Sequence, residues 1–425
     1  MSLSKPVPYD AQKSILSFMD PMVRLEFAQR CPAIQNINKI IPQKFEYFET
    51  DESCLEVNQT VIRMGIIKLY KNGKTPKWIL DENRDGGSHV DLDRYGLSYR
   101  FQFGRDDENI EFIKECLEKH SMTEIERARK LEELAARKLR KDQEEPPFEQ
   151  FLQVEFLEKS GKSGKSGNSE NLKLKNREFL VYDGNRIIKK AREYLSKKIF
   201  GEDEKIAVKT FEIGPNIMER SGMGPNPHPK RSFSFGDFSI KAEQLRIETL
   251  IINNVIGNQI RPFLDPNHRI KRVFLNQNLP ELDPIIRNAE FLIINTNNMI
   301  PGIQPAISIW NGWKNPKIHL PKASFCDFLV RRAWESWKME LPEIGRVWSV
   351  GFEKEEKMKE ILTFFGKLGE AEERGNHLIL PINEQSELMI WGEETLETDK
   401  EWCKSKWIVK IEVVVKNSAK RRKYN

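Results

Sequence analysis

The 425-residue sequence has no long apolar run and no apolar leader. No segment approaches the roughly 18 consecutive apolar residues that a transmembrane helix needs. The opening, MSLSKPVPYD, lacks the apolar core of a secretory signal. We therefore expect no membrane association and an intracellular protein, located in the cytoplasm, the nucleus or both.

The residues that usually build metal and disulfide sites are few and scattered. The five cysteines form no CxxC pair, and none of the six histidines pairs with another at the spacing of a metal-binding helix. We expect the cysteines to be reduced and mainly buried. We predict no metal and no cofactor.

Catalytic motifs are also missing. No G-x-S-x-G nucleophile motif occurs. The stretch SGMGPNPH at 221–228 lacks the GK[ST] ending of a phosphate loop, and Pro225 and Pro227 prevent a helix from starting there. Carboxylate runs such as GEDEK and EKEEK are typical of solvated helix faces. We predict that the chain is not an enzyme.

The composition indicates a protein with a substantial core and a charged surface. Hydrophobic residues make up 39% and charged residues 31%, and the length suits two to three domains. The net charge of +5 is too small to indicate nucleic-acid binding, which remains the weaker alternative. The basic tail at 417–425 is either a nuclear address or a solvated end.

The first segment, residues 1–42, predicts three short helices. Residues 8–37 read PYDAQKSILSFMDPMVRLEFAQRCPAIQNI. We expect helices over about 11–19, from Pro21 to Cys31, and over 33–40. Asp20 caps the second helix, and the Cys31-Pro32 step ends it. Such a unit is too small to be stable alone, so it must pack on something.

Residues 43–240 predict a small β-rich module with an insertion. Period-two patterns run from 44 to 103, with turn candidates at Asn58-Gln59 and, as the stronger hairpin signal, Asn72-Gly73. Acidic and basic residues alternate over 106–145, which predicts one exposed charged helix. A flexible linker is expected over 158–172, around KSGKSGNSE. The module resumes after it.

Residues 241–416 carry a degenerate repeat. IETLIINNV, IKRVFLNQN, AEFLIINTN and NPKIHLPKA place Leu250, Val273, Leu292 and Ile318 in equivalent positions, separated by 23, 19 and 26 residues. An Asn at 254, 278 and 297 follows the first three strands. This pattern predicts a leucine-rich-repeat-like α/β stack. Ordinary buried strands alternating with helices are the alternative. The expected fold class is α+β.

Five tryptophans, at 310, 313, 334, 337 and 348, lie close together in the sequence. Large indole rings usually fill the core between layers, which we expect here. A binding surface is the alternative. Beyond residue 331, alternating helices and strands predict a mostly antiparallel cap that closes one edge of the stack.

Two features together resemble a family. The stretch at 8–37 is similar to an F-box opening. CLEVNQTVIRMGIIKLYKNGKTP, DENRDGGSHVDLDRYG and LRIETLIINNVI resemble a nematode-expanded F-box-like and F-box-associated family of uncharacterised function. The resemblance covers about residues 3–105 and 178–415. The charged segment between them looks like an insertion.

The resemblance implies a substrate-recruiting subunit of a cullin-based ubiquitin ligase. In that case the N-terminal segment docks on a Skp1-like adaptor and the remainder recruits a target protein that the sequence does not identify. Carried over by position, the docking residues are Pro8, Ile15, Leu16, Met19, Pro21, Leu25 and Ala28.

One departure from the family pattern leaves a second hypothesis open. The aromatic residue usual after the cysteine is replaced by CPAIQNI. In this second hypothesis, the chain is a free-standing interaction scaffold whose N-terminal segment is packed into the fold. This alternative predicts that residues 44–103 bury both Ile15 and Leu16.

Overall fold

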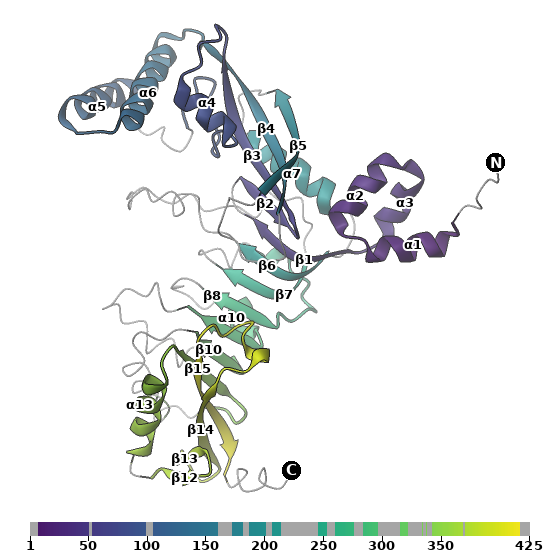
Figure 1. Ribbon diagram of the computed structural model, residues 1–425, viewed down its shortest axis with the longest axis vertical. Helices are drawn as coiled ribbons and strands as arrows, with labels where there is room; N and C mark the ends of the chain where they lie inside the picture. The colour runs from purple at the N-terminus through teal and green to yellow at the C-terminus, as the bar shows by residue number, and fades with distance from the viewer. Residues whose placement is uncertain are drawn as a thin grey trace. The chain divides into compact units, whose positions relative to one another are not determined.

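The computed structural model (Figure 1) divides the chain into two compact units. Unit 1 consists of Met1–Ile206 and Asn216–Lys241, and unit 2 of Ala207–Pro215 and Ala242–Asn425. Helices and strands occur in both, so the chain is mixed α+β. The residues that the structure describes are 7–50, 53–98, 105–159, 172–181, 187–200, 206–213, 245–252, 260–275, 284–295, 315–321, 334, 337, 342–368 and 370–416.

Unit 1 contains an antiparallel sheet in the order β1-β2-β3-β4-β5. The two longest strands, β3 and β4, pair from Thr60↔Glu158 to Tyr70↔Phe148. The β2–β3 hairpin turns at Asn58-Gln59, where Asn58 has a φ of 53°. The strands are β1 (Gln43–Thr50), β2 (Cys54–Val57), β3 (Thr60–Tyr70), β4 (Phe148–Lys159) and β5 (Leu172–Val181).

The stronger hairpin signal, Asn72-Gly73, makes a turn but no hairpin. Gly73 has a φ of +65°, and the turn leads from β3 into the helix α4 (Lys77–Arg84). The strand that pairs with β3 beyond this turn is β4, which follows an insertion whose described residues form three helices. The predicted linker over 158–172 is shortened at both ends by β4 and β5, and residues 160–171 lie outside the described part.

The charged segment forms two helices, which corrects the prediction of one. These are α5 (Asp106–Lys119) and α6 (Glu124–Asp142). Thr123 is the N-cap of α6, where its side chain accepts a hydrogen bond from Glu126 N, and the Glu126 carboxylate accepts one from Thr123 N. This reciprocal capping box starts a new helix where charge alternation alone suggested a continuous one.

Ion pairs hold α5 and α6 together as an antiparallel pair. Arg140 Nε donates to Asp106 Oδ2 at 2.9 Å, and the buried Arg137 also contacts Asp106. The hydrogen bond from Arg140 lowers the pKa of the Asp106 carboxyl. On the sheet side, Lys68 Nζ donates to Glu132 at 2.9 Å. Burial raises the pKa of Glu132, an effect that the Lys68 cation opposes.

The segment DENRDGGSHVDLDRYG covers the free edge of β3 beyond the short strand β2. Ile66 and Ser88 exchange backbone hydrogen bonds of 2.8 Å in both directions. The Asn83 side chain pairs with the backbone N and O of Lys68. A Cβ on Gly65 would lie 2.0 Å from the carbonyl oxygen of Gly86, so only glycine permits this approach.

The predicted short N-terminal helices are present in unit 1, beside the strand β1 (Figure 1). The second begins at Pro21 with Asp20 as its N-cap, as expected. It packs on β1 and on α7 (Ile187–Phe200). The three helices are α1 (Tyr9–Phe18), α2 (Pro21–Arg30) and α3 (Pro32–Ile40).

Unit 2 contains the predicted strand ladder. The strands β7 to β11 are parallel, and the ladder joins Leu250 to Val273, Val273 to Leu292, and Leu292 to Ile318. The equivalence of these four positions is therefore confirmed. The strands are β6 (Ile206–Ile213), β7 (Leu245–Ile252), β8 (Arg272–Leu275), β9 (Phe291–Ile294), β10 (Lys317–Leu320) and β11 (Val347–Phe352).

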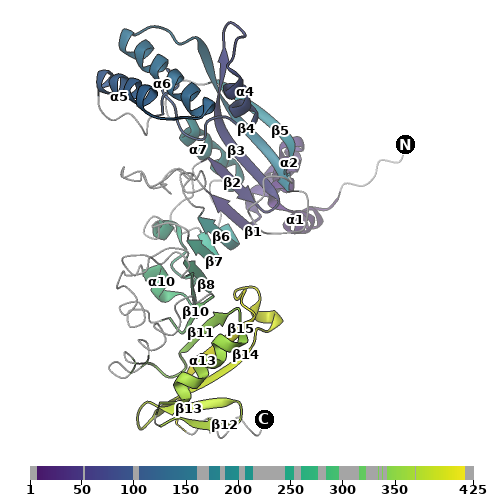
Figure 2. The same cartoon turned by 60° about the vertical axis from the view of Figure 1, so that its left-hand side comes forward.

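The sheet continues with antiparallel strands in the order β11-β15-β14-β13-β12, as the predicted cap requires. The helix α13 (Glu355–Gly366) lies against them (Figure 2): a Cβ on Gly392 would lie 2.7 Å from Met358 Sδ. The strands are β12 (Glu372–Arg374), β13 (His377–Pro381), β14 (Ser386–Glu394) and β15 (Trp407–Val415).

Tryptophans fill the core of unit 2, as expected. Trp334, Trp337 and Trp348 are buried, and the rings of Trp337 and Trp348 lie 4.4 Å apart. Trp310 and Trp313 lie outside the described residues.

One asparagine at a position that the repeat pattern did not indicate hydrogen-bonds to backbone carbonyls ahead of a strand. Asn315 is fully buried before β10, and its Nδ2 donates to the carbonyl oxygens of Ile286, Arg287 and Ala289. These carbonyls belong to the end of α10 (Pro284–Asn288) and the residue after it. The asparagines at 254, 278 and 297 lie outside the described residues.

Candidate functional site

The seven candidate docking residues divide into buried and exposed positions. Leu16 is 2% exposed. It packs against Ile37 of α3 and against Ile41, the residue that caps the end of α3, and Met19 is partly buried beside them. Ile15, the next residue, is 56% exposed. Pro8 is exposed ahead of α1; on α2, Pro21 and Ala28 are buried and Leu25 is half-buried.

The inner face of α2 carries a buried cation that sequence reasoning missed. Arg24 donates to Gln43 Oε1 at 2.6 Å and to the backbone oxygens of Leu16 and Ile41 at 3.4 and 3.5 Å. An arginine between apolar residues in PMVRLEF looks like a solvated position. Three acceptors from α1, from the end of α3 and from β1 let it be buried.

The outer surface of the three helices exposes several apolar side chains. Phe18 is 91% exposed, and Ile15 lies one helical turn before it on α1. Val23 and Phe27, spaced four residues apart on α2, are also exposed. We call Ile15, Phe18, Val23 and Phe27 the apolar surface. Of these, sequence reasoning named Ile15 alone as a docking residue, because the family resemblance supplied positions and not exposure.

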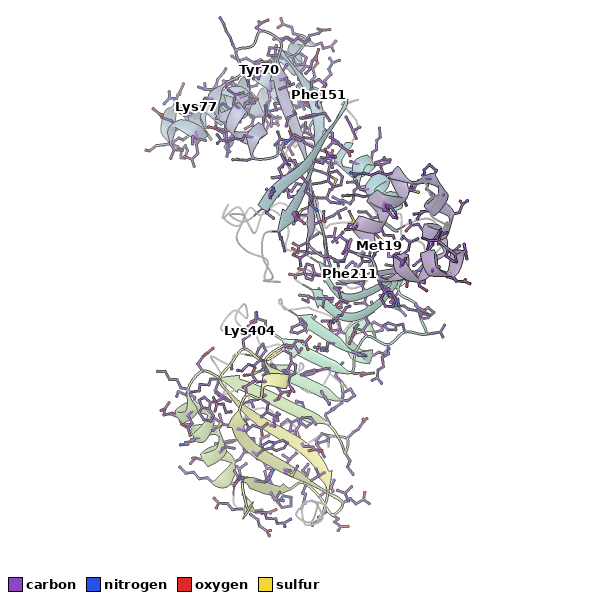
Figure 3. The ribbon with its side chains drawn as sticks, turned by 45° about the vertical axis from the view of Figure 1, so that its right-hand side comes forward. Met19, Tyr70, Lys77, Phe151, Phe211 and Lys404 are labelled. Atoms are coloured by element: carbon purple, nitrogen blue, oxygen red, sulfur yellow. The ribbon has the colours of Figure 1, made fainter. Side chains whose placement is uncertain are left out.

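A polar junction ties the start of α2 to the sheet. Asp20 Oδ1 accepts from Met22 N and Val23 N, while its Oδ2 accepts from Asn58 Nδ2 at 2.5 Å. Asn58 Oδ1 in turn accepts from Glu46 N and from Tyr47 N. The junction uses the left-handed turn residue of the β2–β3 hairpin. The three helices are therefore a fixed part of unit 1. Figure 3 shows Met19 among their side chains.

Unit 2 contains a buried serine–histidine pair, a combination of residues that also occurs in catalytic sites. His319 Nδ1 lies 2.9 Å from Ser349 Oγ, and the ring of Trp402 packs edge-on against His319 at 4.6 Å. Burial lowers the pKa of His319 to about 3. Both residues are buried, so a substrate has no access to them in this arrangement. The pair is part of the core packing.

The described part of the chain offers neither a metal-binding cluster nor a membrane-spanning helix. No group of three or more His, Cys, Asp or Glu side chains is arranged to hold a metal ion there. No helix in it has the length and apolar character needed to cross a membrane. The apolar surface on α1 and α2 is consequently the best candidate site among the described residues.

Part of the chain is similar to a known protein family. Residues 188–354 match the model of a family described as a domain of unknown function (DUF3557). This region begins in α7 and ends just after β11, so it includes the parallel ladder of unit 2 and lies beyond α1–α3. No curated protein and no solved structure matches the chain.

Proposed function

We propose that the chain is a non-catalytic interaction protein that recruits a target to a cullin-type ubiquitin ligase. In this proposal α1–α3 are the F-box-like part and dock on a Skp1-like adaptor, and the rest of the protein binds the target. The observation that carries it is the apolar surface of Ile15, Phe18, Val23 and Phe27. Large exposed apolar side chains gathered on one small unit mark interaction sites.

The internal packing of the helices supports a surface built for contact. Leu16, Ile37 and Ile41 already form a core for the unit. Ile15 and Phe18 are therefore not needed to hold the helices together. Burying one such side chain against a partner is worth about 1.5–3 kcal/mol.

The scaffold alternative also has support, from the junction. Arg24 with Gln43, and Asp20 with Asn58, pack α2 into the fold as that alternative expects. However, it requires Ile15 to be buried by residues 44–103, and Ile15 is exposed. Leu16 is covered chiefly by α3. Exposure of Ile15 favours docking over the scaffold.

The test compares adaptor binding by the full-length chain and its variants. The double variant Ile15→Asp, Phe18→Asp should lose binding to a purified Skp1-like adaptor by at least about tenfold, since two apolar contacts become charged. Its thermal midpoint should stay unchanged because both positions are exposed. Phe112→Asp on α5 is the matched control, also at an exposed aromatic position, and should bind normally.

The outcome separates the two functions. Unchanged adaptor binding by the double variant, or no binding by the wild-type chain, contradicts the docking proposal and leaves the scaffold. Leu16→Asp serves as a reference for misfolding: it should lower the thermal midpoint, because the charge enters the core of the helices.

A further inference from the structure

Strand β5 forms the outer edge of the unit 1 sheet. Among the described strands it pairs with β4 alone, and both ribbon views place it at the margin of the sheet (Figures 1 and 2). It has ten residues, whereas natural edge strands are often short. Among the nine residues from Leu172 to Leu180, all but Leu172 and Glu178 have exposed side chains.

The first half of β5 carries the usual protection of an edge. The pairing with β4 shifts so that Lys175 has no opposite residue, which makes a bulge. Lys173 and Lys175 flank Leu174 there. Lysines and bulges on an edge strand oppose the addition of another strand.

The second half, from Arg177 to Val181, has neither device. It is paired regularly with β4 and exposes Phe179 and Leu180 on opposite faces of the sheet. Arg177 is its one cation: Arg177 Nη2 donates to the buried Glu155 at 2.6 Å, and the rest of its side chain remains partly exposed. Lys173 and Lys175 are further cations on β5, and Lys175 Nζ lies 3.1 Å from Glu158 of β4. The strand thus carries three cations against one anion, the half-buried Glu178.

We infer that the edge of β5 from Arg177 to Val181 binds an extended, acidic and apolar segment of a partner protein as an added antiparallel strand. Strand addition of this kind takes affinity from backbone hydrogen bonds and specificity from alternate side chains. A carboxylate opposite Arg177, together with apolar residues opposite Phe179 and Leu180, would make favourable cross-strand pairs. The inference rests on the proposed function, since a recruiting subunit needs a site for its target.

The probe is a labelled peptide, acetyl-Thr-Val-Ile-Thr-Glu-Thr-Glu-amide, titrated against the full-length chain by fluorescence anisotropy. We expect saturable binding, protection of the Arg177–Val181 amides in hydrogen exchange, and no binding of an N-methylated peptide that cannot pair through its backbone. Replacing both glutamates by lysine should weaken binding about tenfold. Absence of binding, or protection elsewhere in the chain, overturns the inference.

Two substitutions on the same strand give a matched comparison. Leu174 and Leu180 are both 44% exposed. Leu180→Lys should weaken peptide binding at least about tenfold, whereas Leu174→Lys, in the half that is already protected, should leave it unchanged. Equal effects of the two variants contradict the assignment.

Two further outcomes identify other causes. If the wild-type chain is a dimer that Leu180→Lys converts to a monomer, the edge binds a second copy and the partner inference is wrong. The variant Ile15→Asp, Phe18→Asp should still bind the peptide. Normal peptide binding by a wild-type chain that binds no adaptor therefore contradicts the docking proposal alone.

Discussion

Leu16 and Ile15 are neighbours of similar polarity, yet one is core and the other surface. Helical periodicity places them on adjacent faces but does not tell which face meets α3. That choice follows from Ile37 and Ile41, which close the core on the Leu16 side. Arg24 is the reverse case. The charge of Arg24 predicts a solvent-exposed side chain. Its burial is possible only because folding brings hydrogen-bond acceptors such as Gln43 next to it.

The buried His319 should make the stability of unit 2 sensitive to acid. Its pKa in the folded protein, about 3, lies below the usual value of 6.5. The unfolded chain therefore binds a proton first as the pH falls. Stability is fully present above about pH 6.5 and is lost progressively toward pH 3, by at most about 1.4 kcal/mol per pH unit.

Urea unfolding followed by tryptophan fluorescence checks this prediction, because every tryptophan except Trp78 lies at position 310 or later. His319→Gln should flatten the dependence of unfolding free energy on pH between 6.5 and 4. The effect of the substitution itself on the unfolding free energy is measured at pH 7.5, where His319 is neutral in the folded and the unfolded state. An unaltered slope in the variant would exclude His319 as the cause.

The sequence predicts whether a segment is a helix or a strand more reliably than it predicts where one helix ends and the next begins. The three N-terminal helices follow from Pro21 and the Cys31-Pro32 step, because proline restricts the backbone locally. The charged insertion was predicted as one helix. Thr123 and Glu126 have the capping-box spacing that marks a second start, and this was the signal available in the sequence.

Thr123→Ala should loosen the start of α6. The variant loses the acceptor for Glu126 N, and removal of a threonine cap costs about 1 kcal/mol. Amide hydrogen exchange should become faster in the first turn of α6 and stay unchanged in β3 and β4. Ser121→Ala, at an exposed position before the cap, is the control. Identical exchange in both variants would show that the capping box does not stabilise the helix.

For the whole molecule, the repeat pattern correctly aligned four strands of unit 2, and the alternation of helices and strands beyond residue 331 predicted their antiparallel cap. The ladder positions Leu250, Val273, Leu292 and Ile318 are buried and in register. Buried parallel strands keep apolar residues at matching places, so the spacing of these residues along the chain reveals the strands. The position of β5 at the edge of the sheet could not be predicted, because the pattern LKLKNREFLV carries no signal for which strand lies outermost.

Val273→Asp tests whether the ladder is the core of unit 2. An unpaired carboxylate at a fully buried position should unfold it. We expect rapid amide exchange in β8, β9 and β10, while β3 and β4 remain protected because they belong to the other compact unit. Thr249→Val, which keeps the side chain's shape in the neighbouring strand, should leave protection intact. Loss of protection in both units would contradict this division.

Local chemistry in the sequence determined the short N-terminal helices, the Asp20 cap and the register of the parallel strands, since proline, capping side chains and apolar spacing act over a few residues. Tertiary structure decided which apolar side chains on those helices stay exposed, how Arg24 and His319 became buried, and that β5 is an edge. These depend on contacts between segments far apart in the chain, for which a single sequence carries no local signal.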